Sequence, residues 1–320
     1  MQADRAELDA LAARHGFLPT TLEKVLRLGD LLTELGREPL LREALLLKGG
    51  TALNLRDQAP VRLSVDLDFN YVRAEKREAM LADRPEIESA ITRIARAGSY
   101  QVQLSAEEHA GRKLFLTYRN AAGLQDRIEV DVNYLHRVPL AEPDELELWQ
   151  PGDHPRPRVR QVGVSELVAG KLCAFLDRAA PRDLFDVARL PAVVGAGWGL
   201  KPFRSVFVAL AGTLPHAVHS YRSDRLERAT DAAIEEQLYP MLARRADAPS
   251  GPELRAAAWK VVAPLLDLTD DEREFTDRLQ RGELSPELIF GAQPDLAARA
   301  ARHPGLLWKA ENAAKGGDHR

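Results

Sequence analysis

Residues 62–69 read Arg-Leu-Ser-Val-Asp-Leu-Asp-Phe, a run in which polar and apolar side chains alternate. Because side chains alternate between the two faces of a β-strand, this pattern predicts a strand within residues 63–71. The apolar face, suited to packing on helices, carries Val65, Leu67 and Phe69. The polar face carries Ser64, Asp66 and Asp68. The strand therefore places two carboxylates on one side of a sheet.

These two carboxylates, Asp66 and Asp68, are the first candidates for chemistry. A rise of about 3.3 Å per residue puts their backbones about 7 Å apart. Two negative charges at this spacing repel each other, and a cation between them would allow both to stay ionised. Mg²⁺ is the natural cation, because it prefers carboxylate oxygen and is commonly held by one or two acids plus substrate phosphates. The alternative is that both side chains lie on the solvated face of a sheet.

A second acidic strand is predicted over residues 127–134, where the same alternation recurs. Its polar face carries Glu129, Asp131 and Asn133. If the two strands are neighbours, Asp131 supplies a third carboxylate for a two-metal centre and a group able to accept a proton from an attacking hydroxyl. The alternative, a solvated face of an antiparallel sheet, applies to Asp131 as well.

A glycine turn precedes the first acidic strand. An apolar run over residues 44–48 ends in Lys48, and Gly49, Gly50 and Thr51 follow, opening a predicted helical turn. Glycine lets backbone N–H groups approach a triphosphate closely, and a helix N-terminus favours anions. Gly-Gly alone is a common turn, and Lys48 beside it is either a nucleotide contact or an exposed strand-end lysine.

The pattern of apolar and polar residues changes near residue 160. Before it, the patterns predict helices within residues 1–35 and over 85–97, and strands over 44–48, 63–71, 100–104, 113–118 and 127–134, followed by a connector over 139–157. From residue 165 onward they predict helices over 165–178, 181–190, 226–242, 253–266 and 270–280, and no strand. The expected architecture is α+β with two lobes: residues 1–160 form a mixed sheet flanked by helices, and residues 161–320 form an all-α domain.

Composition narrows the class of protein. The 320 residues have 45% hydrophobic side chains, a formal net charge of −4 and one cysteine, Cys173, which excludes an internal disulfide and a multi-cysteine zinc site. We expect a cytoplasmic protein without a membrane span, since no apolar run approaches the roughly 20 residues that a span needs. A basic cluster at residues 154–160 is either a solvated linker or a patch that contacts phosphates.

The glycine turn, the following helical turn and the Asp-x-Asp strand together resemble the polymerase-beta-type nucleotidyltransferase superfamily. More closely, residues 48–53 and 62–69 resemble the AbiEii/MenT family of toxin nucleotidyltransferases. Residues 166–172, 181–187 and 303–312 resemble later motifs of that family, so the likeness spans residues 45–312. It implies a nucleotidyltransferase domain over residues 1–160 and a helical domain over 161–320 that completes the nucleotide and acceptor site.

The resemblance also implies roles for particular residues. Asp66, Asp68 and Asp131 become metal ligands and catalytic groups, with Gly49, Gly50 and Thr51 in the phosphate loop. Lys171 is expected to neutralise charge on the leaving pyrophosphate, or else to be a solvated helix lysine. Arg182 and Asp186 line the nucleotide site or order Lys171 through a salt bridge, although acids near a helix start are also favoured structurally.

Ser64 shares the polar face with the two metal ligands. It either contacts the incoming triphosphate or bonds to the sheet or to Arg62. A phosphate group on Ser64 would place further negative charge beside Asp66 and is expected to block metal and NTP binding.

The function implied by the resemblance is transfer of NMP from an NTP, with Mg²⁺, to an RNA acceptor, expected to be the 3′ end of tRNA. Such a toxin blocks translation, is paired with an antitoxin and is expected to be a monomer. One alternative is a nucleotidyltransferase that modifies a protein or a small molecule. Another is an NTP-binding module without catalysis, against which the intact set Asp66, Asp68 and Asp131 argues.

Overall fold

The computed structural model describes residues 3–108, 110–244 and 247–317. The chain divides into two compact units. The first unit comprises Met1–Arg137, Pro143–Val162 and Tyr239–Ala248. The second unit comprises Val138–Glu142, Gly163–Leu238 and Pro249–Arg320. The change near residue 160 expected from the sequence lies close to the junction at residues 162 and 163, but each unit also takes a short segment from the other part of the chain.

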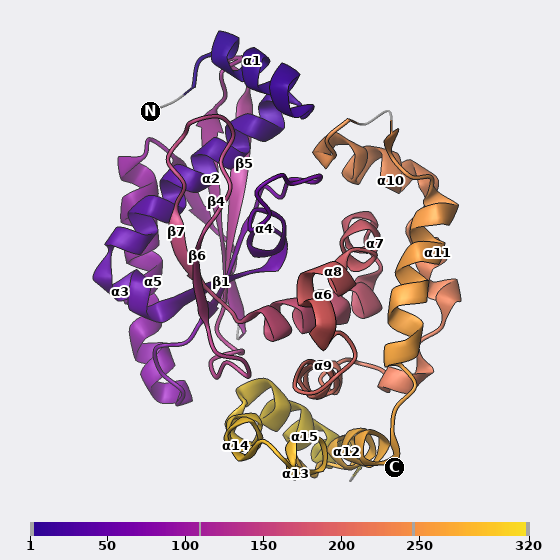
Figure 1. Cartoon of the computed structure of the whole chain (residues 1–320). Coiled ribbons are helices and arrows are strands. Elements are labelled where there is room, and N and C mark those ends of the chain that lie inside the picture. Colours follow the sequence, from indigo (N-terminus) through magenta and orange to yellow (C-terminus); the bar gives the residue numbers. More distant parts are fainter. Residues whose placement is uncertain (1–2, 109, 245–246, 318–320) are drawn as a thin grey trace. The chain divides into compact units, whose positions relative to one another are not determined.

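A mixed sheet organises the first unit (Figure 1). In the described residues its seven strands follow the order β3-β4-β5-β2-β1-β7-β6. They are β1 (Leu45–Lys48), β2 (Leu67–Tyr71), β3 (Gln101–Leu104), β4 (Gly111–Arg119), β5 (Gln125–Asn133), β6 (Asp144–Glu147) and β7 (Arg158–Gln161). Strand β2 is antiparallel to β1 and parallel to β5, and β7 is parallel to β1. The predicted mixed sheet flanked by helices is confirmed.

The helices of the first unit are α1 (Arg5–His15), α2 (Pro19–Arg37), α3 (Pro39–Ala44), α4 (Gly49–Asn54) and α5 (Arg77–Ala97). Helices α2, α3 and α5 cover one face of the sheet (Figure 1). The leucine-rich stripe of α2 explains its position, since Leu22, Leu28 and Leu32 are almost fully buried. The helix predicted over 85–97 is longer than expected. Helix α5 begins at Arg77, and Pro85 lies inside it rather than at its start.

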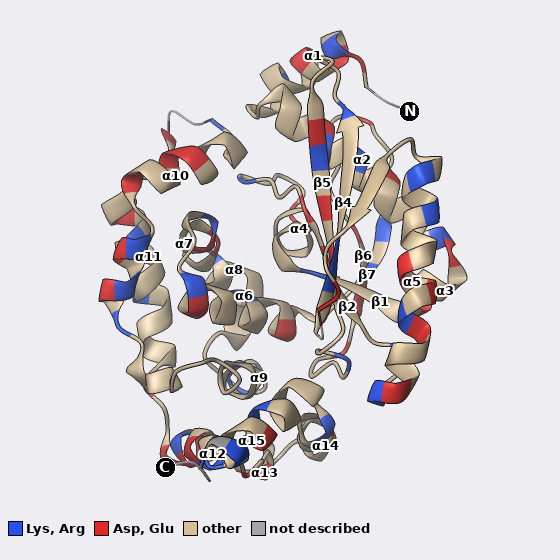
Figure 2. Ribbon diagram, turned by 180° about the vertical axis from the view of Figure 1, so that it is seen from behind, with Lys and Arg blue, Asp and Glu red and all other residues tan. Residues whose placement is uncertain are grey.

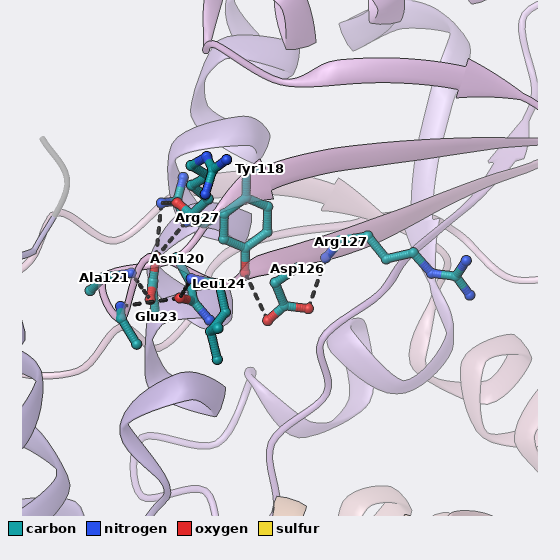
Figure 3. Close-up of polar contacts among 10 residues, drawn as sticks. Glu23, Arg27, Tyr118, Asn120, Ala121, Leu124, Asp126 and Arg127 are labelled. Atoms are coloured by element: carbon teal, nitrogen blue, oxygen red, sulfur yellow. Dashed lines mark hydrogen bonds and ion pairs between the residues drawn. The ribbon is translucent and has the colours of Figure 1, made fainter.

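Two buried charges fix α2 to the turn between β4 and β5 (Figure 3). The Arg27 guanidinium donates to Glu23, at 2.8 Å, and lies 3.9 Å from the centre of the Tyr118 ring. The other Glu23 oxygen accepts from the Ala121 backbone N–H at 2.9 Å. These contacts hold the β4–β5 hairpin against α2. Strand β5 of this hairpin is the second acidic strand.

The first acidic strand is shorter than the alternation predicted. Strand β2 begins at Leu67, so residues 63–66 lie outside it. Their backbone is engaged elsewhere: the Leu63 N–H donates to the Met241 carbonyl at 2.9 Å, and Arg62 forms an isolated bridge with Leu242. The connector predicted over 139–157 is also only partly right, because β6 forms within it and pairs with β7.

The second unit is helical in its described residues, as predicted. Its α-helices are α6 (Val164–Arg178), α7 (Pro181–Val187), α8 (Leu190–Val194), α9 (Phe203–Ala211), α10 (Asp231–Gln237), α11 (Gly251–Val262), α12 (Asp270–Gln280), α13 (Glu287–Phe290), α14 (Pro294–Arg302) and α15 (Pro304–Gly317). The single helix predicted over 226–242 is wrong. Thr230 starts α10 by accepting from the Ala233 N–H, and 3₁₀ turns precede and follow that helix.

Candidate active site

A row of four charged residues crosses the middle of the sheet. Lys48 of β1 pairs in register with Asp68 of β2, and Asp68 pairs in register with Asp131 of β5. Asp131 in turn faces Lys113 of β4. Residues directly opposite each other on neighbouring strands project to the same face. The structure therefore brings Asp68 and Asp131 together between two lysines, and charged residues recur along β5 (Figure 2).

The face that carries Asp131 is half-buried rather than fully solvated. Strand β5 is parallel to β2 and antiparallel to β4, and Asp68 and Asp131 are each partly exposed. The other face of β5 packs into the core through Ile128, Val130 and Val132, each at most 1% exposed. The alternation in the sequence thus marks the boundary between the core and the charged row.

Asp66 lies one residue before β2 begins and is half-buried. Its backbone carbonyl accepts a hydrogen bond of 2.5 Å from the Thr51 hydroxyl. Thr51 is fully buried. The Thr51 side chain therefore ties the glycine turn to the segment that carries Asp66, and only its backbone is left to meet a phosphate.

Both glycines of the turn are required by what lies next to them. Gly49 has φ +73°, in the left-handed region, and a Cβ there would lie 2.2 Å from an Asp68 carboxylate oxygen. A Cβ on Gly50 would lie 2.6 Å from the Ser64 hydroxyl and 3.4 Å from an Arg62 guanidinium nitrogen. Asp68 and Ser64 therefore pack directly on the backbone of the turn.

The charges of the row act on Asp131. Burial raises the pKa of this carboxyl, Lys48 opposes the rise, and the neighbouring Asp68 carboxylate adds to it. A raised pKa makes Asp131 a better proton acceptor than an ordinary surface aspartate would be.

His136 also belongs to this neighbourhood, and no motif in the sequence pointed to it. Asn133, the last residue of β5, accepts hydrogen bonds of 2.9 Å from the N–H groups of Leu135 and His136. Burial and the nearby Lys48 charge lower the pKa of His136 to about 4, so its imidazole is neutral at pH 7. The one signal in the sequence was the alternation of polar residues along β5, which ends at Asn133. The side chain of Asn133 is the group that binds the backbone of His136.

The carboxylates suit a divalent cation that also binds substrate. Within the part of the chain that the structure describes, no group of three or more His, Cys, Asp or Glu is arranged to hold a metal ion by itself. Mg²⁺ seldom uses a dedicated protein cage, and it is usually held by one or two carboxylates together with phosphate oxygens. Two in-register acids beside a glycine turn fit that requirement.

The second unit holds a separate buried cluster on α6 and α7. The Lys171 ammonium lies 3.1 Å from Asp183 and 2.9 Å from Asp186, and Arg178 lies 2.8 Å from Asp183. Burial alone would raise the pKa of Asp183, but the charges of Lys171 and Arg178 lower it. Lys171 is only 8% exposed, so the alternative of a solvated lysine is wrong. The predicted salt bridge between Asp186 and Lys171 is confirmed, whereas Arg182 is half-buried beside it.

The basic cluster at residues 154–160 is only partly a linker, because its last three residues belong to β7, which lies between β1 and β6. Arg158 and Arg160 lie on β7, and a pocket lined by both also includes Leu45 and Phe69. Leu45 and Phe69 alternate with Lys48 and Asp68, so this pocket opens on the opposite face.

A mixed sheet with paired acids beside a glycine turn is the arrangement of a nucleotidyltransferase. Residues 30–263 match the family model described as nucleotidyl transferase AbiEii toxin, type IV TA system, and the chain belongs to this family. It is therefore a nucleotidyltransferase toxin of a type IV toxin–antitoxin system.

A solved structure supports the fold. MenT4, a nucleotidyltransferase toxin from Mycobacterium tuberculosis H37Rv, superposes with a TM-score of 0.60 at 19% sequence identity, and the match covers 91% of this chain and 97% of MenT4. No curated protein matches the sequence. No helix in the described residues is long and apolar enough to cross a membrane.

Proposed function

We propose that the chain transfers NMP from an NTP, in the presence of Mg²⁺, to an RNA acceptor, and that this acceptor is the 3′ end of tRNA. The observation that carries the proposal is the in-register pair Asp68 and Asp131 next to Gly49. Modification of that end would prevent aminoacylation and so block translation.

The first unit is proposed to hold the metal and the triphosphate. Asp66, Asp68 and Asp131 would be the protein ligands of Mg²⁺, which when bound supplies positive charge to the phosphates. The open backbone at Gly49 and Gly50 lets N–H groups approach the triphosphate. Lys48, in register with Asp68, and Ser64, against Gly50, are proposed as further nucleotide contacts.

Asp131 is proposed to accept the proton of the attacking hydroxyl. The hydroxyl oxygen forms a bond to the α-phosphorus while the bond from that phosphorus to the pyrophosphate oxygen breaks. The proton moves to the Asp131 carboxylate and pyrophosphate leaves. Asp131 is in register with Asp68, so its carboxylate lies next to the second acid of the pair, where the hydroxyl would be bound.

The second unit is proposed to contribute Lys171 to the same reaction, as a cation that offsets charge on the departing pyrophosphate. Asp183 and Asp186 hold the Lys171 ammonium in one position. Arg182 and Asp186 are proposed to border the nucleotide. On this proposal, residues 1–160 form the nucleotidyltransferase domain and residues 161–320 the helical domain that completes it.

The family implies an antitoxin partner and an NTP substrate. We further propose that the toxin acts as a monomer in the cytoplasm, where both NTP and tRNA are present.

The proposal is tested by offering each α-labelled NTP in turn, with Mg²⁺, to total RNA and, separately, to total cell protein and small molecules. We expect one NTP to label RNA, and sequencing of the labelled 3′ ends to show added nucleotides on tRNA. Label in protein or in small molecules would contradict the RNA acceptor. NTP binding without any transfer would contradict catalysis.

A further inference from the structure

A pocket with an apolar floor lies in the first unit, with its floor on the face of the sheet away from the charged row. Its cavity of about 340 Å³ lies between the C-terminal part of α2, α3 and the segment that enters β7. Phe69 and Leu45 contribute to its lining, and they alternate along β2 and β1 with Asp68 and Lys48. The pocket is therefore distinct from the candidate active site.

The floor of this pocket is apolar. It is made by side chains that are each at most 7% exposed: Leu32, Leu35, Leu41, Leu45, Phe69 and Val159. Gly36 of α2 also borders it, next to the backbone of Arg158. This floor suits a flat or apolar part of a ligand.

The rim is strongly basic. Among the described residues, five arginines and one acid, Glu145, line the pocket. The arginines are Arg37, Arg42, Arg156, Arg158 and Arg160. Three of them, at every second residue of one segment, alternate in the sequence with the buried Pro157 and Val159.

Two of these arginines donate hydrogen bonds to neutral groups. Arg160 donates to the Arg42 carbonyl at 2.8 Å, and Arg156 donates to the Gln58 side-chain oxygen. Glu145 is shared, at 3.1 Å from Arg158 and 3.9 Å from Arg42. Arg37 pairs with Glu34 at 2.5 Å. With Glu34 and Glu145 counted against the five arginines, the rim still has more positive than negative charge above the apolar floor.

The geometry points to a nucleotide-binding site in this pocket, with phosphate on the arginine rim and the base on the apolar floor. Guanidinium groups bind phosphate oxygens in a two-point fork, which explains the choice of arginine. The cavity falls at the lower end of the roughly 300–1,000 Å³ typical of small-ligand sites, which suits one nucleotide better than a protein segment. The nucleotide is either free or part of an RNA strand. This inference does not depend on the proposed reaction, since it concerns binding alone.

The test measures binding in EDTA, so that a metal-dependent nucleotide site contributes little. The probes are the four NTPs, an eight-residue single-stranded oligouridylate and inorganic pyrophosphate, titrated by calorimetry or fluorescence anisotropy against the full chain. Arg156→Glu with Arg160→Glu removes the rim charge. Gly36→Leu keeps every arginine and adds a side chain at the pocket wall. Arg14→Glu with Arg96→Glu, on exposed positions of α1 and α5, is the control for net charge.

We expect at least a tenfold loss of nucleotide or oligouridylate binding in both pocket variants and no change in the control. For the oligonucleotide, the double arginine variant should also lower the slope of log affinity against log salt by about 0.7 for each phosphate that it no longer binds. Binding of NTPs as well as RNA assigns a free nucleotide, and binding of RNA alone assigns a nucleotide within a strand. Equal loss in the control, unchanged binding in Gly36→Leu, or pyrophosphate binding as tight as that of NTP would each overturn the inference. So would tight binding of an acidic leucine-containing peptide where nucleotides and RNA fail.

Discussion

At the scale of single residues, the pair Asp68 and Asp131 carries the chemistry. Asp68→Asn keeps the size of the side chain and removes one of the two adjacent charges, so nucleotide transfer should fall on the order of 100- to 1,000-fold. The measurement is incorporation of labelled NMP, with thermal unfolding to verify the fold. Glu129→Gln is the matched control, because Glu129 lies on the same face of β5 but pairs with Arg127 and Lys113. Equal losses in the two variants would remove the special role of the pair.

Ser64 offers a second test at this scale. It is 6% exposed and its hydroxyl lies against Gly50, so a negative group there meets both the glycine turn and the nearby Asp66 segment. Ser64→Glu, like a phosphate on Ser64, should abolish NTP binding, whereas Ser64→Ala should bind within a few-fold of the parent chain. Equilibrium titration with each NTP and Mg²⁺ measures this. NTP binding by the glutamate variant at the parent affinity would show that Ser64 lies outside the nucleotide site.

At the scale of elements, the turn between β1 and α4 sets the position of Asp68. Gly49→Ala places a Cβ in space now held by the Asp68 carboxylate, at a φ that costs an L-residue about 1–2 kcal/mol. Because a shift of about 1 Å in a catalytic group can cost on the order of 100-fold in rate, transfer should fall by about that factor. Gly123→Ala is the control: its φ is +78°, and no atom lies within 4 Å of the position that a Cβ would take. It should lower stability by a similar strain and leave transfer unchanged. A loss of transfer in both variants, or in neither, would contradict the proposed contact.

The α6–α7 pair depends on its buried ion cluster. Asp183 is 1% exposed and contacts both Lys171 and Arg178, so Asp183→Asn should lower the free energy of unfolding by about 3–5 kcal/mol at pH 7. The pKa of Asp183 is lowered from 3.8 in the folded state. The stabilisation that ionised Asp183 gives to the folded state is therefore complete above pH 3.8 and is lost as the pH falls through the folded-state pKa. The difference between the variant and the parent in urea unfolding should therefore shrink below pH 3.8. Asp177→Asn, at an exposed position of α6 close to Arg178, should show no such difference. A pH-independent difference for Asp183→Asn would assign it to packing alone.

The same elements show what could be predicted from the sequence. Alternation identified the acidic strands, and the glycine pair identified the turn, because both patterns are local. The register that sets Asp68 beside Asp131 joins residues 63 positions apart, and no local pattern specifies it. Strand β2 also begins later than predicted because of a contact between distant residues. The Leu63 N–H donates to the Met241 carbonyl, which no local pattern specifies. A salt bridge from Asp186 to Lys171 was among the predicted roles, but the second partner, Asp183, and the burial of Lys171 depend on how α7 packs on α6.

At the scale of the whole molecule, the two units are interleaved along the chain. The first unit takes residues 239–248 and the second takes residues 138–142, where the Glu166 carboxylate accepts from the Leu140 N–H at 2.7 Å. A division by composition near residue 160 misses both segments, because backbone pairing and single hydrogen bonds leave no mark on composition. A fragment ending at residue 160 would lack the partner of the Arg62–Leu63 segment that leads into Asp66.

The central claim is that the charged row of the intact chain is where metal and nucleotide meet. The direct measurement is a crystal structure of the full chain with Mn²⁺ and a non-hydrolysable NTP analogue, with the metal located by its anomalous signal. We expect Mn²⁺ bound by Asp68 together with Asp66 or Asp131 and by phosphate oxygens of the analogue. A metal–nucleotide complex bound elsewhere, with these three carboxylates away from it, would contradict the account.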